Sequence, residues 1–157
     1  MKKVLAVAFS MIFVLLAFAG CGSDNSNSDV ELSKVLADVN DNGGLSSMKT
    51  ITNTTDLQKQ FDIDPESVSD FIAEVSEDSE FPTTVIVTKA VDEEAVGDIN
   101  SKLNTYLNDK LSNAQSYNKD QVSTIEKCKV QDNGLYSMLV IAEDYEKIEK
   151  IIQGYFE

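Results

Sequence analysis

Two acidic patterns in the sequence have the residue types and spacing of calcium ligands. The first, Asp38-Val-Asn-Asp-Asn-Gly43, matches the opening of an EF-hand loop, which needs a bidentate carboxylate at position twelve. That position is Lys49, and a positive charge there replaces two oxygen ligands. The second pattern alternates Asp62, Asp64 and Glu66, which could hold a hard cation or cap the start of a helix. We expect both patterns to serve helix ends, and we predict no metal site and no cofactor.

Residue types that support catalysis are scarce. The chain has no histidine and no arginine, so it lacks a ready proton shuttle near neutral pH and a bidentate clamp for phosphate. Cys128 has no histidine to act as its base and falls on an inward position of a predicted strand, which favours a core role. A glycine-rich phosphate loop is absent. We therefore predict no catalytic residues and a protein that is not an enzyme.

An apolar run followed by a cysteine predicts a covalent modification. Lys2 and Lys3 precede residues 4–19, which carry no charge, and Phe18-Ala-Gly-Cys21 ends the run. This set resembles the lipobox of bacterial lipoproteins, with Phe18 where leucine is usual. The match implies diacylglyceryl transfer to the Cys21 sulfur and cleavage before it, and two acyl chains anchor a protein stably. The predicted site residue is thus Cys21, and the predicted partner is the lipid bilayer through acylated Cys21.

Two alternatives to this anchor remain open. An ordinary signal peptide cut near Ala19 would release a secreted protein. An uncleaved helix would need roughly 20 apolar residues to span a bilayer, and the run is a little shorter. The lipid anchor places the protein at the cell membrane, on its extracytoplasmic face, because the first lysines stay in the cytoplasm.

The charge of the exported chain limits its partners. After residues 1–20 are removed, 11 lysines face 27 carboxylates, a net charge of −16. Nucleic acid is excluded as a partner, since lysine and arginine must neutralise phosphates. An acidic domain is also repelled by anionic lipid, so we expect it to stand off the membrane. With Cys21 lipidated, no intramolecular disulfide is possible and the domain must fold by its core.

Hydrophobic periodicity predicts a single α+β domain over residues 30–157, after a signal peptide at 1–20 and a flexible tether at 21–29. Asn133-Gly134 lies between two β-prone runs and predicts a hairpin. A right-handed crossover then places the first strand beside the third. We therefore predict N-terminal helices followed by β-α-β-β-α, with a three-stranded sheet in the order 1-3-2 packed by helices. The predicted helices cover residues 30–40, 55–60, 92–113 and 143–156. One more predicted helix starts at Asp64 and buries Val68, Phe71, Ile72 and Val75. The predicted strands cover residues 83–89, 128–131 and 135–142.

Three short motifs carry a resemblance to a known family. They are Phe61-Asp-Ile-Asp-Pro65, the run Thr84-Val-Ile-Val-Thr-Lys89 leading to Asp92, and Gly134-Leu-Tyr136 at the entry to an apolar strand. With the lipobox before them, they resemble an uncharacterised family of lipoproteins from Gram-positive bacteria, the domain of unknown function 4358, over about residues 30 to 157. The resemblance implies an extracytoplasmic location with a lipid anchor, and it implies no enzymatic activity.

These observations favour a membrane-anchored, non-enzymatic domain that binds a protein or a cell-wall component at the cell envelope. Two alternatives stay open. One is a carboxylate-dependent hydrolase that acts on envelope material, and the other is a cation or small-ligand binder.

Overall fold

The computed structural model describes residues 29–77 and 81–157. The predicted signal peptide, Cys21 and all of the predicted tether except Asp29 lie outside the described residues. Within the described ranges, no helix has the length and apolar character needed to cross a membrane.

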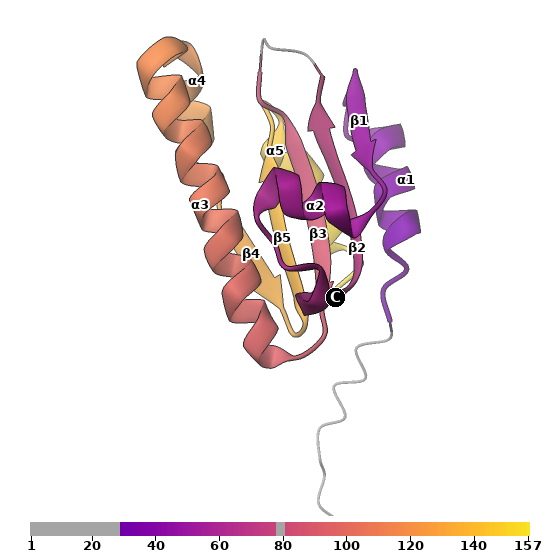
Figure 1. Cartoon of the computed structure of the whole chain (residues 1–157). Coiled ribbons are helices and arrows are strands. Elements are labelled where there is room, and N and C mark those ends of the chain that lie inside the picture. The colour runs from indigo at the N-terminus through magenta and orange to yellow at the C-terminus, as the bar shows by residue number, and fades with distance from the viewer. Residues whose placement is uncertain (1–28, 78–80) are drawn as a thin grey trace, which may run out of the picture.

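The domain is α+β, with helices on both sides of an antiparallel sheet of five strands in the order β1-β2-β3-β5-β4 (Figure 1). The strands are β1 (Met48–Ile51), β2 (Val68–Ser76), β3 (Thr84–Ala90), β4 (Val130–Asn133) and β5 (Tyr136–Ile141). The helices are α1 (Leu32–Asn42), α2 (Thr54–Phe61), the 3-10 turn η1 (Pro65–Ser67), α3 (Glu93–Tyr117), α4 (Lys119–Ile125) and α5 (Tyr145–Gln153).

The sheet has a hydrophobic core on each face, because successive side chains of a strand point to opposite sides. On one face, α2, α3 and α4 pack over Ile86 and Leu139. On the other face, α1 and α5 pack over Val85 and Val87, and Figure 1 shows both helices behind the sheet. All three central residues of β3 are fully buried, as the unbroken apolar run predicted.

The predicted three-stranded sheet is wrong, because two strands precede the three that the sequence indicated. The helix predicted from Asp64 is instead the short turn η1 followed by β2. A β-bulge between Val68 and Asp70 shifts the register of β2 against β3. The bulge brings Val68 and Phe71 to the same face of the sheet, and Ile72 is buried on the other face. The apolar residues of β2 therefore have spacings of three and four that imitate a helix. The other missed strand, β1, has only four residues, and Lys49 and Thr50 in it are exposed.

The predicted order of the last three strands does occur within the larger sheet. β3, β5 and β4 are neighbours in that order, and β5 runs antiparallel to both. Gly134 has a positive φ of 58° in the connection between β4 and β5, so the Asn-Gly signal marked a real hairpin. Asp92 caps α3 as its side chain accepts a hydrogen bond from Ala95 N (2.9 Å), which fixes where the crossover helix begins.

Candidate functional site

An open cleft of about 450 Å³ lies at one end of the sheet, where β3 begins and β5 ends. One wall is the loop of residues 43–46 that follows α1. Other parts of the lining come from α4 and from the residues that lead from β5 into α5. Thr83 and Ser76 form the part of the floor that belongs to the β2–β3 hairpin. The cleft is therefore assembled from segments that are far apart in the sequence.

The wall loop has a specialised backbone. Gly43 is buried, and a Cβ atom there would lie 2.3 Å from the carbonyl oxygen of Val39 and 3.3 Å from a side-chain carbon of Ile148. Gly44 and Ser47 have positive φ angles of 77° and 54°. A positive φ is uncommon for a residue other than glycine, and such conformations concentrate at functional sites. This loop holds the C-terminal end of α1 directly against α5.

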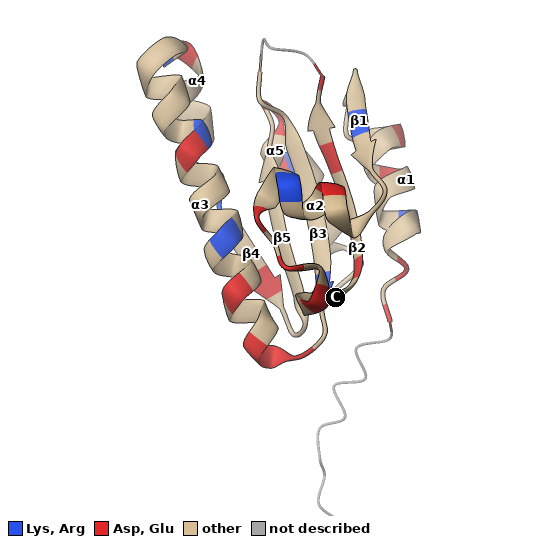
Figure 2. Ribbon diagram, viewed as in Figure 1, with Lys and Arg blue, Asp and Glu red and all other residues tan. Residues whose placement is uncertain are grey.

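The charged side chains that line the cleft are all acidic. Asp120 comes from α4, and Glu143 and Asp144 precede α5. All three are exposed to solvent. Among the residues that the structure describes, no lysine lines the cleft, although Figure 2 shows lysines on β1, α2 and α3. A group that enters the cleft therefore meets a negative potential, which favours a positively charged ligand.

Hydroxyl groups and a small apolar surface complete the lining. Ser46, Thr83 and Thr124 offer donors and acceptors, and Phe81 and Ile148 offer apolar contact. A second cavity of about 230 Å³ adjoins the cleft, since Ser76 and Gln121 line both. Such a surface suits a small polar ligand that carries a positive charge and hydrogen-bonding groups.

The two acidic patterns seen in the sequence act at helix ends. The EF-hand-like residues form the last turn of α1 and its cap at Gly43, so they do not make a calcium loop. Asp62 caps α2 in the left-handed conformation and pairs with Lys102. Asp64 caps η1, where its side chain accepts a hydrogen bond from Glu66 N (2.9 Å). Among the described residues, no three histidine, cysteine or carboxylate side chains group as a metal site would require.

Cys128 lies in the core, as predicted, but it precedes β4 and does not lie on a strand. It is 3 % exposed, and its thiol donates a hydrogen bond to Thr124 O (3.5 Å). Burial raises the pKa of the Cys128 thiol, because a low-dielectric environment disfavours the thiolate. A protonated, enclosed thiol is a poor nucleophile.

Glu74 is a buried carboxylate that the sequence did not single out. It is 4 % exposed, and its Oε1 accepts hydrogen bonds from Thr50 Oγ1 (2.8 Å) and Asn40 Nδ2 (3.2 Å). These contacts join β2 to β1 and to α1. Neither of the cavities described above includes Glu74 among its lining residues.

No motif in the sequence indicates the cleft. Asp120, Glu143 and Asp144 become neighbours of one cavity only through the packing of α4 and α5. The nearest local signal is Gly43, the last residue of a pattern that we expect to serve a helix end, and Gly43 does cap α1. Cys21, the predicted lipid attachment site, lies outside the described residues.

A family model described as "Domain of unknown function (DUF4358)" matches residues 41–142. No curated protein and no solved structure matches the chain significantly. The matched range includes the wall loop, α4 and all five strands, and it ends where β5 leads into the acidic residues of the cleft.

Proposed function

The chain belongs to the DUF4358 family, and we propose that its domain is a lipid-anchored binding module on the extracytoplasmic face of the cell membrane. In this proposal the acyl chains on Cys21 hold the domain, and the cleft binds an amine-bearing component of the cell envelope. The domain itself catalyses no reaction.

The acidic cleft is the observation that carries the binding proposal. Its volume of about 450 Å³ lies within the range of small-molecule sites. Asp120, Glu143 and Asp144 line this volume, and no described lysine lines it with them, although Lys110 lines the adjoining smaller cavity. An ammonium group has three donors and a positive charge, so carboxylates and hydroxyls are its natural partners.

Solvent exposure favours binding over hydrolysis. A carboxyl group that acts as the general acid of a glycosidase is usually desolvated in an apolar pocket. The three carboxylates of the cleft are exposed. Exposed carboxylates attract a cation without being specialised for proton transfer, so the hydrolase alternative has less support than the binding proposal.

The anchor part of the proposal rests on the sequence before Asp29. Phe18-Ala-Gly-Cys21 follows an uncharged run and two lysines, and this layout resembles the lipobox of bacterial lipoproteins with Phe18 in place of leucine. The test is to express Cys21→Ser in the native host and to separate membrane and soluble fractions. We expect the variant to leave the membrane fraction. Unchanged fractionation would rule out the lipid anchor.

The cleft is tested with small cationic probes. Spermidine and calcium chloride are titrated separately into isotopically labelled protein, and amide chemical shifts are followed by NMR, with inorganic phosphate as the anionic probe. We expect a cationic probe to shift the amides of Ser46 and Thr83, which line the cleft, and phosphate to leave them in place. The variant Glu143→Gln with Asp144→Asn should weaken binding roughly three- to tenfold, because each exposed charge contributes up to about 1 kcal/mol.

A matched control separates the cleft from the general acidity of the domain. Glu94→Gln with Asp98→Asn removes two exposed carboxylates of α3 that do not line the cleft. This control should bind the cationic probes as the wild type does. Equal loss of affinity in both double variants would show non-specific attraction, and the proposed site would be wrong.

A further inference from the structure

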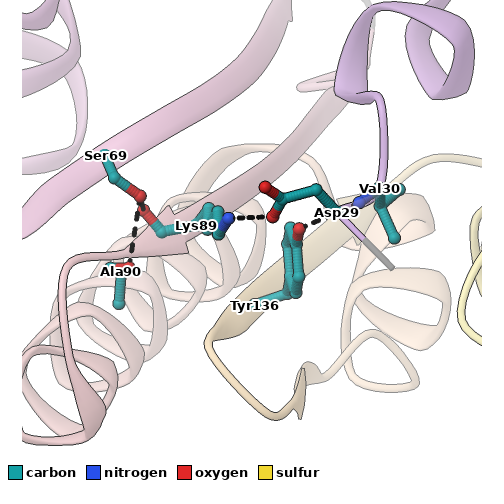
Figure 3. A network of polar contacts seen from close by, with 6 residues as sticks. All are labelled: Asp29, Val30, Ser69, Lys89, Ala90 and Tyr136. Carbon is teal, nitrogen blue, oxygen red and sulfur yellow. Dashed lines mark hydrogen bonds and ion pairs between the residues drawn. The ribbon is translucent and has the colours of Figure 1, made fainter. Parts of the chain in front are cut away.

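The first described residues are attached to the end of the sheet opposite the cleft. The side chain of Asp29 forms an ion pair with Lys89 of β3 (Figure 3). The backbone N–H of Val30 donates a hydrogen bond to Tyr136 Oη of β5 (3.1 Å). Lys89 Nζ also lies 5.8 Å from the centroid of the Tyr136 ring, within range of a cation–π contact.

Neighbouring contacts make this attachment point rigid. Ser69 Oγ donates to Lys89 O (3.0 Å), so the backbone at Lys89 is tied to β2. The Tyr136 ring packs edge-on against Phe156 (5.0 Å between centroids), and Tyr136 is only 2 % exposed. Lys89 and Tyr136 therefore belong to paired strands of the sheet, and their side chains hold the chain segment at Asp29 in position.

The register of the sheet shows that the attachment point and the cleft lie at opposite ends. Lys89 pairs with Tyr136 at one end of the β3–β5 ladder, and Thr84 pairs with Ile141 at the other. Thr83 directly precedes Thr84 and Ala142 directly follows Ile141, and both residues line the cleft. Five residue steps at about 3.4 Å separate the two pairs by about 17 Å.

We propose that Asp29, Lys89 and Tyr136 form a clasp that fixes where the N-terminal segment leaves the domain, so that the lipid-anchored protein presents its cleft away from the bilayer. This inference rests on the proposed lipid anchor. Eight residues, 21–28, join the acylated cysteine to the clasp and span at most about 28 Å. The clasp end of the domain is then the end nearer the bilayer. The cleft faces away from the bilayer, where a cell-wall component can enter it directly.

Loss of the clasp changes the geometry in a defined direction. Without it, the first residue held by regular structure is Leu32 at the start of α1. Three more residues then join the linker, which adds about 10 Å of chain and leaves its direction unfixed. The domain gains rotational freedom, and its clasp end moves farther from the bilayer.

The clasp contact is tested first without a membrane. Amide hydrogen exchange of Val30 is measured by NMR in the wild type and in Tyr136→Phe, which keeps the ring and its packing on Phe156 but removes the acceptor. We expect exchange at Val30 to become about fivefold faster, because one hydrogen bond is lost. Unchanged exchange in the variant would overturn the clasp. Tyr155→Phe is the control, since Tyr155 bonds to α1 and not to Val30.

The orientation is tested on the lipidated protein in vesicles that carry a headgroup-attached quencher. A fluorophore is placed at the cleft through Ser46→Cys, or at the hairpin beside Tyr136 through Asn133→Cys. Cys128 is buried, so it does not compete for the label. We expect roughly twofold stronger quenching at the hairpin than at the cleft, because the sheet separates the two ends by about 17 Å. Lys89→Ala with Tyr136→Phe should reduce this ratio.

The outcomes distinguish the two proposals. Equal quenching at both positions in the wild type, on protein that floats with the vesicles, would overturn the orientation and leave the lipid anchor standing. A ratio unaffected by Lys89→Ala with Tyr136→Phe would overturn the role of the clasp. Protein recovered without lipid would contradict the proposed anchor and the orientation with it, while the exchange of Val30 would still report the contact.

Discussion

Replacement of Gly43 by alanine should destabilise the domain, because the structure leaves no room for a Cβ atom. The added atom would lie 2.3 Å from Val39 O, a backbone atom that cannot rotate away, and 3.3 Å from Ile148. Overpacking of this kind costs about 1–3 kcal/mol. For a domain of this size, that loss corresponds to a decrease in Tm of about 4–12 °C. Urea unfolding followed by far-ultraviolet circular dichroism measures it, with an unchanged m-value expected.

Gly97→Ala is the matched control for this substitution. Gly97 is an exposed residue within α3, and a Cβ atom there would meet nothing within 4 Å. Alanine in a helix interior is favoured over glycine by about 0.5–1 kcal/mol, so this variant should gain stability. If Gly43→Ala were as stable as the wild type or gained stability like Gly97→Ala, the close packing of the wall loop against α5 would be wrong.

Three further predictions follow from individual contacts. Lys89 lowers the pKa of the Asp29 carboxyl through its hydrogen bond. The pair therefore stabilises the domain fully at a pH above the pKa of the unfolded chain, and this stabilisation is lost as the pH falls through the pKa of the folded protein. An NMR titration should give a lower midpoint for Asp29 in the wild type than in Lys89→Ala, and equal midpoints would contradict the pair. Cys128 should react with a maleimide only after urea unfolding, and rapid labelling of folded protein would contradict its burial. Thr50→Val should cost about 1–3 kcal/mol in urea unfolding because it removes a donor from the buried Glu74 carboxylate, and unchanged stability would mean that the bond contributes nothing.

The part of the fold that the sequence predicted correctly has strong local signals. The apolar run of β3, the Asn-Gly turn and the acidic start of α3 each act within a few residues, and together they determine the order of three strands. The connection rules for a right-handed crossover then leave few alternatives.

The part of the fold that the sequence predicted wrongly is the first two strands, and β2 contains a β-bulge. β2 buries Val68 and Ala73 on one face of the sheet and Ile72 on the other, and the bulge at Val68 and Asp70 makes the spacing still less regular. No local preference distinguishes such a bulged strand from a helix, since the pairing with β3 decides between them. β1 is too short to display any period, and it forms because β2 offers it an edge.

The candidate site could not be predicted from the sequence either, because it also depends on tertiary packing. The carboxylates of Asp120 and Glu143 are 23 positions apart and carry no motif, and the cleft between them forms only when α4 and α5 pack on opposite faces of the sheet. Lys89 and Tyr136 are likewise brought together with Asp29 by strand pairing. In contrast, the proposal for Cys21 comes from the sequence alone, because signal-peptide patterns are contiguous stretches of residues.

Mass spectrometry of the mature N-terminus, on protein purified from its native membrane, tests the lipid anchor most directly. The account predicts a chain that begins at Cys21 and carries a diacylglyceryl group on its sulfur. A chain that begins elsewhere without lipid, or an intact precursor that begins at Met1, would contradict it.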